Sequence, residues 1–161
     1  MSKLQLKLKT TLGNLYLVAS EVGLQKVTFA QNDGVVFVNA ANETNSIGQI
    51  LARAARQIQE YFQGTRKEFE VKLDWNGTPF QVGVWEQLLK LPYGTTASYK
   101  QIAKSIKNEK AMRAVGTANG RNPLSIIIPC HRVIAADGSI GGYAGGINIK
   151  QKLLEIERRY S

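Results

Sequence analysis

The alternation of apolar and polar residues near the start of the chain is the feature that most limits its possible folds. Leu4, Leu6 and Leu8 alternate with polar residues, and the same two-residue period returns over residues 15–19 and 27–29. A period of two places successive side chains on opposite faces of a strand. With turn signals between the runs, the pattern predicts a meander of short antiparallel strands over residues 3–30, and residues 35–38 are a candidate further strand.

The period then changes to that of a helix. Over residues 47–62 apolar residues recur at three- and four-residue intervals, and Gly64 is expected to end the helix. Alternation returns over residues 67–73 and predicts a strand that rejoins the first sheet. We therefore expect residues 1–75 to form an α+β supporting domain, a small antiparallel sheet with a helix, followed by a linker.

Residues 76–161 are expected to form a second, mostly helical domain. Pro79 suits a helix start, and Ser98 with Gln101 matches a capping box at the start of another helix. A tight corner at residues 107–109 and a helix over residues 110–119 complete a candidate helix-turn-helix.

A glycine-rich loop, residues 138–146, precedes the last predicted helix, residues 148–159. The loop lacks the Gly-Lys-Ser/Thr of a phosphate-binding loop, so a tight loop facing a substrate is the better interpretation. The helix is expected to turn its apolar residues inward, namely Ile149, Leu153, Ile156 and Tyr160.

Composition limits the chemistry. The 161 residues include one Cys and one His, so an internal disulfide is excluded and a zinc site of the usual Cys/His kind lacks ligands. No apolar run approaches the ~20 residues of a membrane span, and the start lacks a signal-peptide core, so we expect a reducing compartment. The formal charge of +9 favours a polyanionic partner.

The Cys and the His are adjacent, as Cys130 and His131, at the end of a β-branched run that Pro129 stops. Such a run is expected to be buried and to place the thiol at the mouth of a rigid wall. A lone Cys can equally be an inert buried side chain, and a lone His a structural one.

The segment Pro129-Cys130-His131-Arg132-Val133 resembles the active-site signature of the O6-alkylguanine-DNA alkyltransferases. The resemblance extends in order over about half the chain, through Pro92-Tyr93-Gly94, Ser98-Tyr99, Arg113-Ala114-Val115-Gly116, Asn122-Pro123, Gly141-Gly142-Tyr143-Ala144-Gly145-Gly146 and Leu153-Leu154-Glu155-Ile156-Glu157. It implies a repair protein that flips O6-alkylguanine out of DNA and transfers the alkyl group irreversibly to its own Cys130, once per molecule, with O4-alkylthymine as a weaker substrate.

The resemblance also implies the catalytic roles. Cys130 is the nucleophile, and His131 accepts its proton through a water molecule, since neighbouring side chains on an extended chain point apart. Glu157 orients the histidine, and Glu155 would lie on another side of the helix. Asn122 braces the recognition helix against the Cys segment, and Tyr99 helps to rotate the phosphate and donates to the flipped base.

The expected DNA surface is the second helix of the helix-turn-helix, whose small side chains would let its backbone approach a groove. The resemblance implies that Arg113 is the family's arginine that takes the place of the flipped base. A cluster of basic residues with Glu109 as its sole acid supports phosphate binding. Besides Arg113, the DNA-binding candidates are Tyr99, Lys110, Ala114, Gly116, Thr117 and Arg121.

The substrate pocket is expected to include Val133, Tyr143 and Ala144. The resemblance implies that backbone groups of Cys130 and Val133 receive the guanine amino group. Ala144 stands where some relatives carry a Ser, so a side-chain hydrogen bond near the guanine oxygen is lost there.

The implied partner is double-stranded DNA carrying O6-alkylguanine, with no membrane partner, no cofactor and no metal. We expect a monomer in solution, with cooperativity on DNA left open, in the cytoplasm of a prokaryote (associated with the nucleoid) or the nucleus of a eukaryote. Two other classes are left open by the residues: a thiol hydrolase with turnover, and a non-catalytic helix-turn-helix protein that binds DNA or its lesions.

Overall fold

The computed structural model describes residues 2–39 and 45–161. It divides into two compact units, Met1–Asn76 and Gly77–Ser161. The first unit ends close to Asp74, whose carboxylate accepts hydrogen bonds from Ser20 Oγ at 2.6 Å and Gln25 Nε2 at 2.8 Å. The α+β fold class predicted from the sequence is confirmed.

A sheet forms the first unit's framework. In the described residues its order is β3-β2-β1-β4, from strands β1 (Lys3–Thr10), β2 (Gly13–Ser20), β3 (Leu24–Thr28) and β4 (Val36–Phe37). The first three form the predicted antiparallel meander, whereas β4 pairs parallel to β1. The sheet is therefore mainly, not wholly, antiparallel. Gln5 fixes the crossover before β4, because its side chain donates to Asn32 O at 2.8 Å and accepts from Asn32 N at 2.9 Å.

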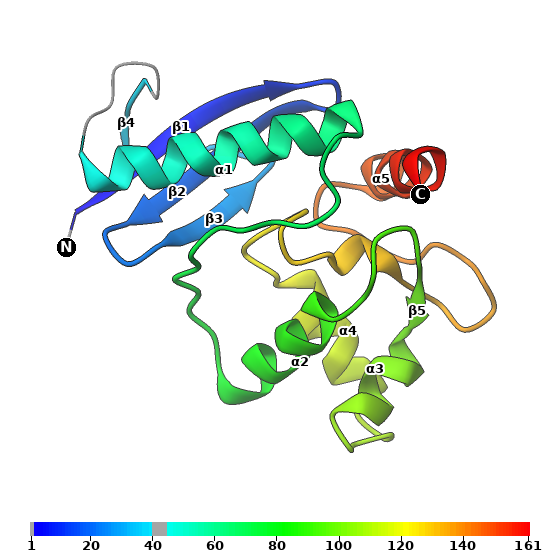
Figure 1. Cartoon of the computed structure of the whole chain (residues 1–161). Helices are drawn as coiled ribbons and strands as arrows, with labels where there is room; N and C mark the ends of the chain where they lie inside the picture. Colours follow the sequence, from blue (N-terminus) through cyan, green and yellow to red (C-terminus); the bar gives the residue numbers. More distant parts are fainter. Residues whose placement is uncertain (1, 40–44) are drawn as a thin grey trace. The chain divides into compact units, whose positions relative to one another are not determined.

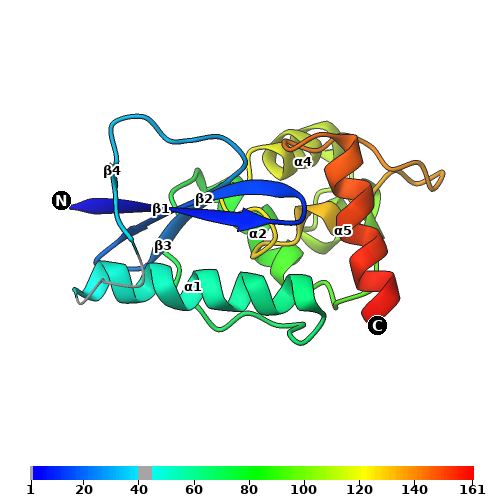
Figure 2. The same cartoon turned by 90° about the horizontal axis from the view of Figure 1, so that it is seen from above.

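Helix α1 (Ser46–Gln63) lies along one face of this sheet, as Figures 1 and 2 show. The Asn45 side chain caps its start by accepting from Gly48 N at 2.7 Å, and Gly64 ends it at φ 80°. Both ends agree with the sequence prediction. The unit's core lies between helix and sheet: Leu6, Leu8, Leu15, Leu17, Ala19, Leu24, Val27, Ile47, Leu51, Ala54, Ile58 and Tyr61.

The strand predicted over residues 67–73 was wrong. This segment makes a single parallel bridge, Leu73 to Leu24, and no ladder is formed within the described residues. Side chains of α1 occupy its backbone groups instead: Arg53 Nε donates to Glu70 O at 2.7 Å, and Glu70 N donates to Gln57 Oε1 at 2.9 Å. Backbone groups satisfied by a helix are not available to a sheet.

The second unit is mostly helical. In chain order its elements are α2 (Pro79–Leu89), β5 (Ala97–Ser98), α3 (Tyr99–Ser105), α4 (Met112–Gly120), the 3₁₀ helix η2 (Cys130–Arg132), β6 (Val133–Ile134) and α5 (Ile147–Tyr160). Strands β5 and β6 pair in parallel. The predicted capping box is present, with Gln101 N donating to Ser98 Oγ at 3.1 Å and Ser98 N to Gln101 Oε1 at 2.8 Å.

The connection between α3 and α4 is longer than the sequence predicted. Helix α4 begins at Met112, so residues 106–111 form the turn, with Lys107 in the left-handed region at φ 60°. Trp85 Nε1 donates to Ala118 O at 2.9 Å and ties α4 to α2. These contacts fix the orientation of α4 within its unit.

The buried face of α5 differs from the one expected. Leu153 is buried, but Ile149, Ile156 and Tyr160 are only partly so. The residues that accompany Leu153 inside are Lys150 and Glu157, at 0% and 1% exposure. A helix that buries two charged side chains must satisfy them with polar partners, and those partners form the site described next. No helix in the described residues is long and apolar enough to cross a bilayer.

Candidate active site

Cys130 follows a buried but irregular segment. Ile126, Ile127 and Ile128 are at most 5% exposed, as expected from their β-branched run. They do not form a strand, however: Ile126 has φ 74°, and a Ser125–Ile128 bridge folds the segment back on itself. Left-handed backbone is costly for a β-branched residue, so neighbouring groups must hold this turn.

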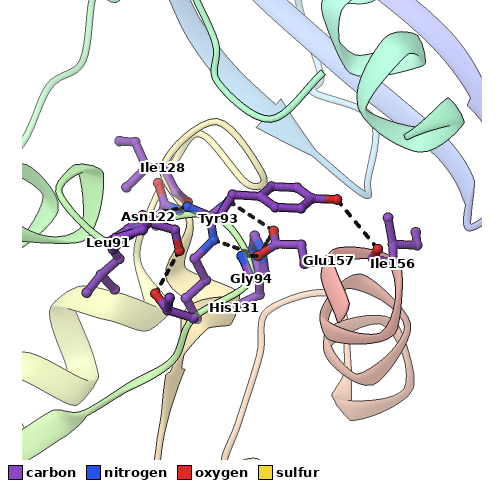
Figure 3. A network of polar contacts seen from close by, with 11 residues as sticks. Leu91, Tyr93, Gly94, Asn122, Ile128, His131, Ile156 and Glu157 are labelled. Carbon is purple, nitrogen blue, oxygen red and sulfur yellow. Dashed lines mark hydrogen bonds and ion pairs between the residues drawn. The ribbon is translucent and has the colours of Figure 1, made fainter. Parts of the chain in front are cut away.

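Asn122 supplies that support. It is 8% exposed, its Nδ2 donates to Ile128 O at 2.8 Å, and its Oδ1 accepts from Leu124 N at 2.9 Å. Figure 3 shows the Asn122 side chain directed at Ile128. Asn122, the residue after the Arg121 C-cap of α4, therefore stabilises the turn that leads to Cys130.

Cys130 and His131 lie on the single turn of η2, so they are not on the extended chain that the sequence suggested. The ring of His131 points toward Glu157, with Nε2 2.5 Å from Oε2, as Figure 3 shows. Arg132 binds the same carboxylate through Nε at 2.8 Å and Nη2 at 3.0 Å. Gly94 N also donates to Oε1, at 3.2 Å.

These contacts determine the protonation states of Glu157 and His131. Hydrogen bonds from His131 and Arg132 outweigh burial and lower the pKa of Glu157 to about 2. Burial is the main cause of a lowered pKa at His131, opposed by its hydrogen bond to Glu157. A neutral imidazole that donates from Nε2 leaves Nδ1 as an acceptor. That Nδ1 is buried and has no hydrogen-bond partner among the described residues.

The thiol is protonated in the resting protein. Burial raises the pKa of Cys130 to about 11, while the Asn122 side chain and the Lys150 ammonium act in the opposite direction. A nucleophilic thiolate therefore requires that the proton be removed during reaction. The neutral His131 beside it is a suitable base.

A cavity of about 320 Å³ opens on Cys130, a size that suits a small ligand. Its lining residues are Tyr99, Gly116, Asn119, Gly120, Cys130, Gly142, Tyr143 and Ala144. Gly141 allows the loop to approach Tyr99 closely: it has φ 75°, and a Cβ there would lie 3.0 Å from the Tyr99 hydroxyl. Of the expected pocket residues, Tyr143 and Ala144 line the cavity.

Val133 is not among the residues that line the cavity, and its expected contact with the guanine amino group stays a prediction. Its carbonyl already accepts a hydrogen bond from Lys150 Nζ at 2.6 Å, and the Cys130 carbonyl accepts from Asn119 Nδ2 at 3.4 Å. A carbonyl oxygen has two lone pairs, so each can still accept from a ligand.

The expected DNA surface is exposed. Arg113, Ala114 and Thr117 are exposed on α4, Gly116 is partly buried, and Gly116 also lines the cavity, so this helix joins the surface to the site. No side chain among the described residues caps the start of α4. Exposed basic residues lie on α3, in the turn between α3 and α4, and at the end of α4: Lys100, Lys104, Lys107, Lys110 and Arg121.

Two family models match the chain. The model described as the ribonuclease-like domain of 6-O-methylguanine DNA methyltransferase matches residues 5–75, and the one described as its DNA binding domain matches residues 79–159. A methylated-DNA–protein-cysteine methyltransferase of Methanosarcina acetivorans is 45% identical over 149 residues, 92% of this chain and 94% of the relative. The constitutive enzyme of Bacillus subtilis is 43% identical over 152 residues, 93% of this chain and 92% of the relative.

The chain belongs to the methylated-DNA–protein-cysteine methyltransferase family.

This membership confirms the predicted family and enzyme class. A solved structure of Mycobacterium tuberculosis OGT in complex with DNA has a TM-score of 0.88 at 38% identity, covering 98% of this chain and 94% of that chain. The architecture described above is therefore that of a methyltransferase of this family.

Sequence reasoning missed four contributors to this methyltransferase site: Gly94, Asn119, Arg132 and Lys150. Arg132 lies inside the signature segment Pro129–Val133, next to His131. Its position beside the histidine that Glu157 was expected to orient was a usable signal. Lys150 had only a weak signal in the sequence: it follows Ile149, an apolar residue of the predicted amphipathic helix. Asn119 and Gly94 contribute through contacts that no local pattern reveals.

Within residues 2–39 and 45–161, no group of three or more His, Cys, Asp and Glu side chains is placed to hold a metal ion. Glu155, two residues before Glu157, is exposed. The buried acid available to His131 is thus Glu157.

Proposed function

We propose that this methyltransferase repairs double-stranded DNA by taking the alkyl group of an O6-alkylguanine onto Cys130. The supporting observation is a buried thiol that lines a cavity, followed in the chain by a neutral histidine whose Nδ1 has no hydrogen-bond partner among the described residues. The M. tuberculosis relative solved with DNA supports a DNA partner. Because the reacting carbon lies inside the duplex, the base must first be flipped into the cavity.

The chemical step starts with the thiol proton, which passes through a water molecule to His131 Nδ1. The thiolate then attacks the alkyl carbon, an S–C bond forms, and the C–O6 bond breaks with its electron pair left on the guanine. The guanine anion takes a proton from solvent, with Tyr99 as hydrogen-bond donor to the ring, and the His131 imidazolium returns its proton to solvent. Glu157 stabilises the imidazolium that forms, as the acid does in a hydrolase triad.

The product is a thioether, and the site offers no way to hydrolyse it. Each molecule therefore reacts once, which distinguishes this function from thiol hydrolysis with turnover. We place this chemistry in the cytoplasm, where the thiol stays reduced. The O4-alkylthymine activity and a monomeric state in solution remain part of this proposal.

Arg113 is assigned the place of the flipped base. Arg113 is exposed on α4, whereas Gly116 of the same helix lines the cavity. One helix therefore places Arg113 at the gap left in the duplex and Gly116 at the pocket that receives the flipped base. A planar guanidinium can stack and pair where a base has left. Lys110, Thr117 and Arg121 would contact phosphates, and Ala114 would let the backbone approach the groove.

Mass spectrometry of the peptide containing Cys130 tests the main proposal. Incubation with a duplex carrying O6-methylguanine should add one methyl group to that peptide, and an unmodified duplex should add none. Cys130→Ala should still bind the duplex but accept nothing. Methyl label retained by Cys130→Ala would refute the assignment of the acceptor.

Arg113→Ala tests the base-flipping assignment. It should slow the repair of duplex DNA far more than the reaction with free O6-benzylguanine, which needs no flipping. Arg159→Ala, which removes an exposed charge of α5, is the matched control and should leave both rates nearly unchanged. Equal losses on the two substrates would show that Arg113 does not replace the base.

A further inference from the structure

Asn119 carries a buried hydrogen-bond acceptor that the mechanism given so far does not use. Its side chain lies on the last turn of α4, is 4% exposed and lines the same cavity as Cys130. Its Oδ1 has no hydrogen-bond partner among the described residues. A buried amide oxygen without a partner costs free energy, so one beside a ligand cavity calls for a donor on the ligand.

The orientation of this amide is set by the backbone of Cys130. Nδ2 of Asn119 donates to Cys130 O at 3.4 Å. Exchanging the amide nitrogen and oxygen would bring two acceptors together, so this contact assigns Oδ1 to the unpartnered position. The bond is longer than the usual length of about 2.9–3.0 Å, and it therefore leaves the amide able to turn toward a bound base.

The neighbours of Asn119 on α4 leave room for a flat ring. Gly116, one turn earlier, and Gly120, the next residue, also line the cavity. A Cβ at Gly116 would lie 3.9 Å from the Tyr99 ring, and at Gly120 no heavy atom of the described part of the chain lies within 4 Å of an added Cβ. Asn119 is therefore flanked by two positions without side chains, between which a base can approach the amide.

The two expected lesions differ in the donor that Asn119 requires. In DNA the base of O6-alkylguanine keeps its 2-amino group as its only N–H donor, because alkylation of O6 leaves N1 without a hydrogen. O4-alkylthymine has no N–H donor, because alkylation of O4 leaves N3 without a hydrogen. A site with a buried acceptor disfavours a substrate that lacks the matching donor, since the acceptor then stays unpaired.

We propose that Asn119 is a specificity-determining residue whose Oδ1 accepts a hydrogen bond from the 2-amino group of the flipped guanine and so favours O6-alkylguanine over O4-alkylthymine. This inference rests on the proposed function, in which the cavity receives the base. The alkyl carbon and the amino group lie on the same edge of guanine, the edge by which flipped bases are read. A base that presents its alkyl carbon to the Cys130 thiol thus presents its amino group to Asn119 Oδ1 and Cys130 O, one hydrogen to each.

Two free purines that differ only in the 2-amino group test this inference, O6-benzylguanine and O6-benzylhypoxanthine. The quantity measured is the ratio of their rate constants for alkylation of Cys130. Asn119→Leu keeps the approximate size of the side chain and removes both polar atoms. In this variant the ratio should fall by about three- to tenfold, as the loss of one hydrogen bond predicts. The rate with O6-benzylhypoxanthine should stay the same or rise, because that purine has no amino group.

Asn108→Leu is the matched control, because it makes the same chemical change at an exposed position before α4. It should leave the ratio at the value of the parent protein. If Asn119→Leu lowered both rates by the same factor, Asn119 would only support the structure of the site, and the proposal would be overturned. A parent protein that reacts with neither purine would instead defeat the proposed function.

Duplex repair tests the consequence for lesion choice. Asn119→Leu should slow the repair of O6-methylguanine by a similar factor and should not slow the repair of O4-methylthymine. A loss on the thymine lesion as large as that on guanine would contradict the role in specificity.

A further measurement covers the case in which Asn119→Leu does not fold. In Cys130→Ala, which is expected to bind the base without reacting, NMR can follow the side-chain amide of Asn119. At equal occupancy O6-benzylguanine should shift its signals more than O6-benzylhypoxanthine, because a hydrogen bond accepted by Oδ1 polarises the amide. Equal shifts would overturn the proposal, whether or not Cys130 of the parent protein accepts an alkyl group.

Discussion

Arg132 and Glu157 form a buried pair in which the guanidinium holds both carboxylate oxygens, Nε to Oε1 at 2.8 Å and Nη2 to Oε2 at 3.0 Å. His131 shares Oε2, but it is not needed to balance the charge. Because Arg132 balances the charge of Glu157, the imidazole of His131 can stay neutral beside the carboxylate. Arg132 supplies the counter-charge, and His131 keeps the free electron pair that a base requires.

Arg132→Met should therefore change the protonation state of the histidine. Without the guanidinium, Glu157 is balanced by His131 alone, so the pKa of His131 rises, because Arg132 normally lowers it. Alkyl transfer from O6-benzylguanine should then be slowed most at neutral pH and recover as the pH is raised. Breaking the buried pair should also lower the free energy of unfolding by about 3–5 kcal/mol.

The matched control for that variant is Arg158→Met, which removes an exposed arginine of α5. It should leave the pH profile and the stability close to those of the parent. A profile of Arg132→Met that is merely scaled down at every pH would contradict the assigned role and indicate a structural effect alone.

The Glu157 carboxylate should make the protein acid-labile within a defined range. Its pKa is lowered from 4.5 to about 2 in the folded protein, so its stabilisation is fully present above the unfolded value and is lost as the pH falls toward 2. Chemical denaturation across this range should show a loss of a few kcal/mol. Glu157→Gln should abolish that part of the pH dependence, whereas Glu155→Gln, at an exposed position, should preserve it. Equal acid sensitivity in all three proteins would refute the link.

The accuracy of the sequence predictions followed how local each feature is. Helix α1 and the capping box at Ser98 were predicted correctly because their signals lie within one helix. The strand expected near Glu70 failed because distant side chains, from Arg53 and Gln57, bind its backbone. Such competition leaves no mark on the local pattern.

The same distinction applies to the site. The adjacent Cys130 and His131 were evident in the sequence, and the resemblance indicated Glu157. The left-handed turn at Ile126 and the burial of Lys150 were not foreseeable, because β-branched and charged residues ordinarily avoid those environments. Both exceptions lie at the site, where local rules are most often broken.

Asn122→Ala should destabilise the second unit. The change leaves Ile128 O without its bond from Nδ2 and Leu124 N without its acceptor Oδ1, both in a buried turn. Ile128 O keeps its bond from Cys130 N at 2.7 Å, so Leu124 N is the group left unsatisfied. An unsatisfied buried group costs about 1–3 kcal/mol, so the free energy of unfolding should fall by about 1–3 kcal/mol. Denaturant titration measures this, with Asn108→Ala at an exposed position as control. A loss no larger than that of the control would mean that Asn122 does not support the turn.

Two neighbouring glycines of the cavity loop should respond to alanine with opposite signs. Gly141 has φ 75°, and an added Cβ would lie 3.0 Å from the Tyr99 hydroxyl, so Gly141→Ala should lower the free energy of unfolding by about 1–2 kcal/mol. At Gly142 no heavy atom of the described part of the chain lies within 4 Å of an added Cβ, and φ is outside the left-handed region. Gly142→Ala should therefore stabilise the protein by about 0.4–1 kcal/mol, through the unfolded state.

The double variant Gly141→Ala with Tyr99→Phe separates the two costs at Gly141. Removing the Tyr99 oxygen relieves the close contact, while the backbone strain at φ 75° stays, so stability measured against Tyr99→Phe alone should recover only in part. Full recovery would assign the cost to the contact, and no recovery would assign it to the backbone. If Gly141→Ala were as stable as Gly142→Ala, the loop would not be held against Tyr99 at all, and the wall of the cavity next to Cys130 would be free to move.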